Sequence, residues 1–156
     1  MRTTYRAIVD AVASQVPGEP SAHDRMLKTK NVPAGKYMDF RRMSKALHDA
    51  HKDFADARQE IQKGFAEEQP TECPHCQKEI EGWGGLRIPP TKVSEAEDKI
   101  KDLLDSELTL AEETVLLPQK LFPTMDLVVF LDPFFRVEGD DYGDEASEEE
   151  EKADAE

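Results

Sequence analysis

A heptad pattern between Phe40 and Ile61 constrains the fold more than any other feature of this sequence. Apolar residues recur there at alternating spacings of three and four, which places them on one face of a helix. They are Phe40, Met43, Leu47, Ala50, Phe54, Ala57 and Ile61. No proline interrupts the segment, and most intervening residues favour helix. The pattern predicts a helix of about 31 residues, about 46 Å long, whose narrow apolar stripe requires a partner helix.

A second helix, predicted from about Val93, supplies that partner. Ser94 and Glu97 have the spacing of a capping box, and apolar residues follow at helical intervals. Residues 70–90 between the two helices hold both cysteines and are rich in proline and glycine, which predicts a small knuckle. The sequence therefore predicts a mainly α fold, a long antiparallel helical hairpin with a Cys-containing knuckle between its helices.

The flanking segments carry weaker signals. Residues 3–16 have the apolar spacing of a short amphipathic helix that Thr3 or Thr4 can cap, and residues 17–33 resemble a linker. Thr124 can cap a short C-terminal helix over residues 125–131.

Charge separates the end of the chain from the rest. Residues 138–156 contain eleven acidic residues and a single lysine, whereas the whole chain has a net charge of −14. Such a composition is typical of a disordered acidic tail. We therefore expect an N-terminal helix and linker (1–33), a helical-hairpin domain (34–137) and the tail (138–156).

The same charge distribution excludes several functions. Residues 1–137 carry 23 acidic and 19 basic residues, so no basic surface favours direct binding to nucleic acid or to an anionic membrane. No apolar run approaches the roughly 20 residues of a membrane span, and the N-terminus lacks the apolar core of a signal peptide. We expect an intracellular protein.

Three stretches in a fixed order carry a family resemblance. They are NVPAGKYMDFRRMSKALHDAHKDFADARQEIQKGF, KIKDLLDSELTL and LFPTMDLVVFLDPFF. Residues 32–137 resemble a family of small uncharacterised proteins of tailed bacteriophages, a domain of unknown function of the helical-hairpin type. The resemblance implies a non-enzymatic accessory role in the host cytoplasm, with association to the virion left open. The family brings no catalytic residues, and the Cys-containing segment departs from its pattern.

Cys73 and Cys76 form a C-x-x-C turn, which can present two thiolates to a tetrahedral Zn²⁺. A zinc ribbon needs a second such turn 15–20 residues later, and that region has no cysteine. The missing ligands would come from a second chain or from histidines, of which His48, His51 and His75 are the candidates. Two other interpretations remain: a pair of free thiols, or a thiol-disulfide centre in which a helix N-terminus lowers the thiol pKa.

Aromatic residues are the candidate partner-binding groups. Trp83 lies among glycines, where it would either anchor a partner or fold over the knuckle. Residues 127–135 form the most apolar stretch of the chain and must cover another surface. We therefore predict that Phe130, Phe134 and Phe135 join Trp83 in binding a partner.

No catalytic motif accompanies these features: the sequence has no Walker loop, no G-x-S-x-G and no H-E-x-x-H. The favoured function is therefore non-enzymatic binding to a protein, either another protein or a second copy of the chain. The alternative is inhibition of a host or defence enzyme, with the acidic tail imitating a phosphate backbone in its basic groove. The tail would otherwise serve only solubility.

Overall fold

A computed structural model describes residues 1–14, 17–28, 32–68, 75–76 and 85–139. Helices dominate these residues, which confirms the predicted mainly α class. The α-helices are α1 (Tyr5–Val12), α2 (Ala22–Lys28), α3 (Tyr37–Phe65), α4 (Val93–Asp105) and α5 (Met125–Leu131). The strands are β1 (Arg2–Thr4), β2 (Glu67–Glu68), β3 (Leu86–Arg87), β4 (Glu107–Thr109), β5 (Val115–Leu117) and β6 (Phe135–Val137).

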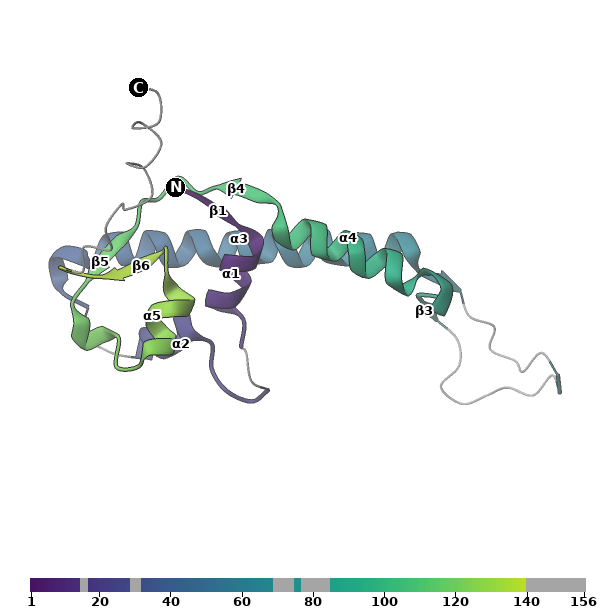
Figure 1. Cartoon of the computed structure of the whole chain (residues 1–156), viewed down its shortest axis with the longest axis horizontal. Helices are drawn as coiled ribbons and strands as arrows, with labels where there is room; N and C mark the ends of the chain where they lie inside the picture. Colours follow the sequence, from purple (N-terminus) through teal and green to yellow (C-terminus); the bar gives the residue numbers. More distant parts are fainter. Residues whose placement is uncertain (15–16, 29–31, 69–74, 77–84, 140–156) are drawn as a thin grey trace, which may run out of the picture.

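Helix α3 is the axis of the molecule, and the other elements lie along it (Figure 1). Its 29 residues correspond to about 44 Å, close to the predicted length. A 3₁₀ turn over Ala34–Lys36 leads into it, and the apolar stripe from Phe40 to Phe54 is buried as the heptad pattern predicted. The outer part of that stripe is less buried, since Ile61 is only half-buried.

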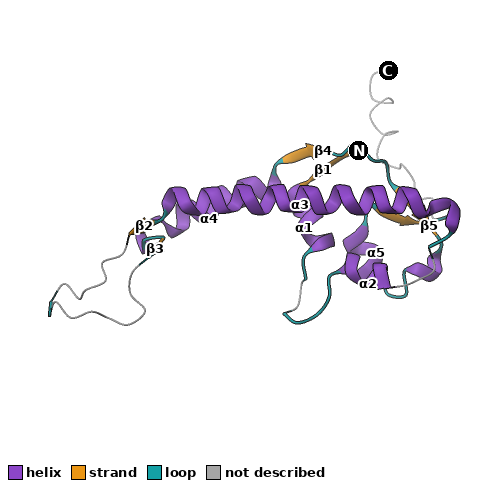
Figure 2. Cartoon of the chain, turned by 180° about the vertical axis from the view of Figure 1, so that it is seen from behind, coloured by secondary structure: helices purple, strands orange, loops and turns teal. Residues whose placement is uncertain are grey.

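The body of the protein is formed by α1, α2, α5, the first half of α3 and four strands (Figure 2). Strands β5 and β6 pair in parallel, with Val115 opposite Phe135 and Leu117 opposite Val137. These four residues are all buried, so the two paired strands together form one side of the core. The largest fully buried apolar side chains of this core are Ile8, Met26, Met43, Leu47, Leu117, Leu121, Leu127, Leu131, Phe134 and Phe135.

The N-terminal segment differs from its prediction. The expected helix over 3–16 is the shorter α1, because residues 2–4 form β1 and pair antiparallel with β4. Thr4 caps α1, its hydroxyl accepting a hydrogen bond from the amide of Ala7 at 3.4 Å. The linker expected over 17–33 contains α2. Side chains of α1 and α2 lie in the same core as those of α3, so the packing joins residues 1–33 to the expected hairpin domain.

The N-terminal caps of α4 and α5 also differ from those predicted. Helix α4 begins at Val93, directly after a 3₁₀ turn over Pro90–Lys92, so Ser94 lies inside the helix and does not cap it. Helix α5 spans the predicted Met125–Leu131, with Thr124 at the N-cap position but without a capping hydrogen bond.

Two predicted regions fall largely outside the described residues. Residues 140–156 of the acidic tail are not described, and the predicted knuckle is described only at His75, Cys76 and from Gly85 onward. The disordered tail and the knuckle therefore stay predictions. Within the described part of the chain, no helix combines the length and apolar character needed to cross a membrane.

Candidate protein-binding arm

Helix α4 lies alongside the outer half of α3, and the two helices project together away from the body (Figures 1 and 2). Just past the end of α3, β2 pairs antiparallel with β3, with Glu67 opposite Arg87 and Glu68 opposite Leu86. We call this unit the arm: α3 from Phe54 to Phe65, together with α4, β2 and β3. Its helices run in opposite directions because β2 and β3 bring the end of α3 close to the start of α4.

The seam between the two helices is incompletely buried. Phe54, with 5% of its surface exposed, and Ala96 are buried apolar residues of the arm. The remaining apolar residues of the seam are half-buried: Ala57, Ile61, Phe65, Ile100, Leu103 and Leu104. Two helices alone cannot enclose a shared apolar stripe, since each covers only one side of the other. The arm therefore leaves apolar surface in contact with water along most of its length.

Interactions at the inner end attach the arm to the body. The ring centroids of Phe54 and Tyr5 are 5.7 Å apart, and the guanidinium of Arg6 lies 2.7 Å from the carboxylate of Asp105. The amide of Tyr5 also donates to the carbonyl of Ser106 at 3.4 Å. Helix α1 thus contacts both helices of the arm where they leave the body.

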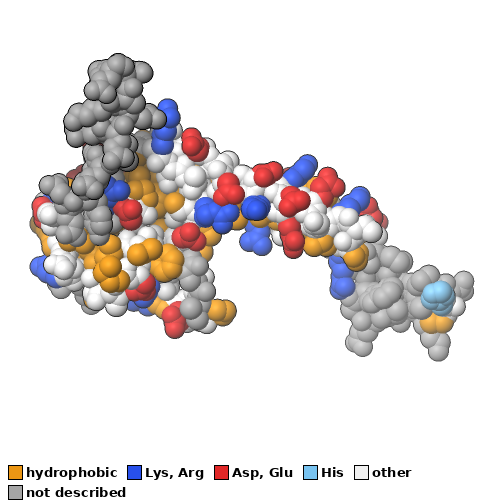
Figure 3. Space-filling model, viewed as in Figure 1, with side chains coloured by type: hydrophobic (Ala, Val, Ile, Leu, Met, Phe, Trp, Pro, Cys, Tyr) orange, Lys and Arg blue, Asp and Glu red, His pale blue; other side chains and the backbone are white. Residues whose placement is uncertain are grey.

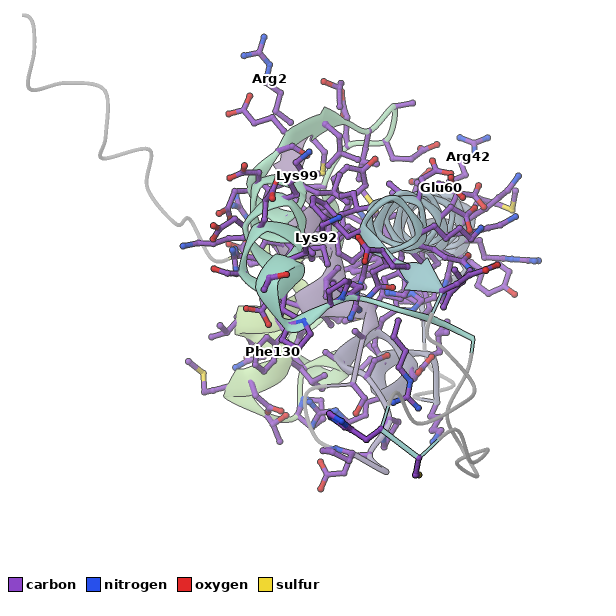
Figure 4. All side chains as sticks on the ribbon, turned by 90° about the vertical axis from the view of Figure 1, so that its right-hand side faces the viewer. Arg2, Arg42, Glu60, Lys92, Lys99 and Phe130 are labelled. Carbon is purple, nitrogen blue, oxygen red and sulfur yellow. The ribbon has the colours of Figure 1, made fainter. Side chains whose placement is uncertain are left out.

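Two lysines hold the outer part of the arm together, Lys92 just before α4 and Lys99 within it. Lys92 Nζ lies 2.6 Å from Glu67 Oε1, and this hydrogen bond raises the pKa of the ammonium group. The ammonium of Lys99 lies 5.3 Å from the ring centroid of Phe65, within the range of a cation–π contact. Figure 4 looks at the arm from its outer end and shows both lysines on the α3 side of α4, whereas Arg42 points away.

Exposed apolar side chains mark the outer end of the arm. Leu86 in β3 has 65% of its surface exposed, and Val93 at the start of α4 has 39%. Figure 3 shows a few hydrophobic side chains near this end and charged side chains of both signs along the shaft, with larger hydrophobic patches on the body. Apolar groups at a projecting end are accessible to a large partner.

One face of α4 is acidic. Four exposed carboxylates lie at spacings of three, four and three residues, so they share that face: Glu95, Asp98, Asp102 and Asp105. Asp105 binds Arg6, and the other three have no ion pair with any described residue. Ala96, Ile100 and Leu103 face α3, so this row of negative charge lies on the opposite face of α4, away from the seam.

The predicted metal ligands are not brought together in the described residues. His48 and His51 lie on the part of α3 that belongs to the body, His48 exposed and His51 half-buried. His75 and Cys76 are exposed beyond the outer end of α3, which is about 21 Å along the helix from His51. Cys73 lies outside the described residues, and no group of three His, Cys, Asp or Glu residues within them is placed to hold a metal.

The predicted aromatic partner site requires a correction. Phe134 and Phe135 are fully buried in the core of the body, so their rings cannot bind a partner. They follow α5 directly and pack against α3 and β5, which bury the most apolar stretch of the chain within the molecule. Phe130 is half-buried against the same core, and Trp83 lies outside the described residues.

His23 is a buried polar residue that the sequence interpretation missed. It lies on α2, fully buried, with Nε2 2.9 Å from the hydroxyl of Ser44 on α3. The available signal was the Ser21–Asp24 spacing, because the hydroxyl of Ser21 accepts a hydrogen bond from the amide of Asp24 and starts the helix.

Comparison of the sequence with family models and curated proteins, and of the structure with solved structures, finds no match.

Proposed function

We propose that this protein is non-enzymatic and acts by binding a protein partner through the arm. The observation that supports the proposal is the half-exposed apolar seam of a helix pair that projects from a body with a core of its own. A body with its own core does not need such a projection for its stability. Apolar surface that stays exposed on a projecting element is typical of a protein interaction site.

The charge on α4 bears on the chemistry of the partner. Glu95, Asp98 and Asp102 lie on the face of α4 that is turned away from the seam, so they favour Lys or Arg in a partner that extends from the seam around α4. The same row of carboxylates disfavours pairing of this face with the same face of a second copy, because like charges would face each other. A different protein with apolar residues for the seam and basic residues for the outer face of α4 is therefore the favoured partner, and self-association through the arm is the less favoured outcome.

The finer features of the sequence interpretation extend this proposal. We infer that the arm is a helical hairpin whose tip carries the knuckle, and that Cys73 and Cys76 bind Zn²⁺ there. The family resemblance favours an accessory role for a bacteriophage in the host cytoplasm. Native mass spectrometry with and without a chelator tests the metal: a mass loss equal to one zinc per chain, or one per dimer, supports it. An unchanged mass in chelator contradicts it.

A pair of double variants tests binding through the arm. Leu86→Ser with Val93→Ser removes exposed apolar groups at its outer end. Met125→Ser with Val129→Ser removes two from the body, where they are 74% and 64% exposed. All four changes are at exposed positions, so the fold is expected to survive each pair.

The readout is affinity isolation from producing cells with quantitative mass spectrometry, alongside light scattering. The arm variant should lose at least about tenfold of each specific partner, since central apolar contacts typically contribute more than 1 kcal/mol each. The body variant should retain them. Equal recovery by both variants, or a wild-type monomer that retains no partner, would contradict the proposal.

The density of carboxylates after residue 138 supports a second candidate, inhibition of a nucleic-acid-binding enzyme by the tail. Deleting residues 140–156 should then abolish inhibition, and added salt should weaken binding. Inhibition that survives the deletion would exclude this candidate.

A further inference from the structure

Helix α2 packs on α5 and α1, and the imidazole of His23 joins it to α3. The side chain is fully buried, with the rings of Phe40 on α3 and Phe135 on β6 at centroid distances of 6.4 and 6.1 Å. The centroids of those two rings are 5.2 Å apart, so both lie on the same side of the imidazole. The hydroxyl of Ser44 lies 2.9 Å from Nε2. A neutral imidazole suits this position, since it offers an apolar ring to the phenylalanines and one polar edge to the serine.

A protonated imidazole does not suit it. Nδ1 is buried and has no hydrogen-bond partner among the described residues, so protonation would leave a charged donor unpaired. The ring of His48 approaches edge-on, with centroids 5.0 Å apart, so a second histidine faces the same space. Placing a buried positive charge next to two phenylalanines and a histidine costs far more than leaving it in water.

Few charged groups are placed to offset that cost. Asp24, on α2 itself, favours the protonated form, while His48 on α3 opposes it. On the other elements packed against α2, Asp126 of α5 binds Arg25, and Arg136 of β6 binds Asp132. Helix α1 contributes Asp10, which is half-buried. Burial therefore dominates the behaviour of the ring.

We propose that α2 is a pH-sensitive latch: protonation of His23 releases α2 from α3 and uncovers the apolar faces of Phe40 and Phe135. This inference concerns the body and is independent of binding through the arm. The segment that would be released is short: α2 has seven residues, and its buried side chains are Ala22, His23 and Met26.

The direction of the pH effect depends on the two states of the ring. Burial, with a smaller effect from His48, lowers the pKa of His23 from 6.5 to about 4. In the released helix the ring returns to its ordinary pKa of about 6.5. The released state thus binds the proton more tightly, so the opening equilibrium is constant above pH 6.5 and grows as pH falls toward 4. Opening should increase about tenfold between pH 7.5 and 5.5, and about 70-fold between pH 7.5 and 4.5.

Hydrogen exchange of the full chain, corrected for intrinsic rates, measures this opening. Peptides that cover residues 22–28 should lose protection between pH 7.5 and 4.5 by those factors, while peptides from α4 should change much less. Loss of protection that is equal in both regions would overturn the latch, because it would indicate general acid unfolding.

Two variants assign the effect to His23. His23→Phe retains the stacking and removes the titration, so protection of α2 should no longer depend on pH. His48→Gln leaves His23 in place and removes a neighbouring positive charge, so the pKa of His23 should rise and the pH-dependent loss should shrink. NMR titration of the His23 ring provides a direct reading in the wild-type chain: a value near 6.5 in the folded protein would overturn the proposal.

Discussion

Replacing Phe54 with alanine should detach the arm from the body without unfolding the body. Phe54 is buried where α3 leaves the body, and its ring packs on Tyr5 of α1. It does not belong to the contiguous core of the body, which ends along α3 at Ala50. The truncation therefore removes the largest buried side chain that joins α1 to the arm, and leaves the packing around Leu47 intact.

The expected cost can be derived from the burial of the ring. Phe→Ala at a buried site typically costs about 3–5 kcal/mol, which combines lost transfer energy with the cavity left behind. The contact with Tyr5 accounts for about 0.5–1.5 kcal/mol of that, as is usual for aromatic pairs. Domains of this size have a free energy of unfolding of about 5–15 kcal/mol, so most of that range leaves a folded variant.

Urea denaturation gives the size of the loss, and hydrogen exchange gives its location. Amide protection in α4 should fall more than in α5, since α4 depends on the junction and α5 does not. Met38→Ala is the matched control: it lies on the same helix but is exposed, and should change the free energy of unfolding by less than about 0.5 kcal/mol. A loss below about 1 kcal/mol for Phe54→Ala, or equal deprotection of α4 and α5, would refute the reasoning.

Two further predictions concern the body. Leu131→Ala should lower the free energy of unfolding by about 2–5 kcal/mol in urea denaturation, because the side chain is fully buried. The control Leu116→Ala should change it little, because Leu116 is exposed. Similar losses in the two variants would contradict the packing of Leu131. Arg25→Gln should cost about 1 kcal/mol or less, because its ion pair with Asp126 is partly exposed. Hydrogen bonds from Thr124 and then Arg25 hold the pKa of Asp126 below its ordinary value, so an NMR titration of the variant should give a higher pKa; an unchanged value would exclude this role for Arg25.

Elements with a periodic signal of their own were predictable from the sequence. The heptad stripe predicted a helix of about 31 residues where α3 has 29, and the apolar run after Thr124 predicted the bounds of α5. A repeated apolar spacing over several turns leaves only one helix face able to enter a core. This pattern is local, so the helix can be predicted without knowing which elements pack against it.

Elements defined by distant pairing were not predictable in the same way. The parallel pair β5 and β6 joins three-residue strands about 20 positions apart, too short for alternation to be distinguished from chance. Helix α2 has only seven residues, and its burial depends on contacts with α5 and α1 rather than on a pattern of its own. The Ser44–His23 contact that attaches it joins two positions that no motif marks in the sequence.

The interpretation of Phe134 and Phe135 shows a second limit. Their apolar character predicts that these side chains are buried, which is correct. The hydrophobic effect is non-directional, however, so it does not specify which surface buries them. A partner protein and the protein's own core satisfy the requirement equally well, and only the chain path distinguishes them. Here β6 continues straight into the parallel pair with β5, so both rings face the core.

The outer part of α3 raises the same question of which surface covers an apolar segment, and there the described chain does not supply a complete cover. Its apolar stripe continues with similar residues from Phe40 to Ile61, yet burial changes along it. The inner part is covered by α1 and β5 and by the rings of His23 and Phe135, whereas α4 is the helix that packs on the outer part among the described residues. Because the sequence keeps its apolar spacing where the described chain supplies only one covering helix, that spacing has no full explanation in the folding of the body. An additional covering surface, supplied by a partner, would explain why Ala57, Ile61 and Phe65 are apolar.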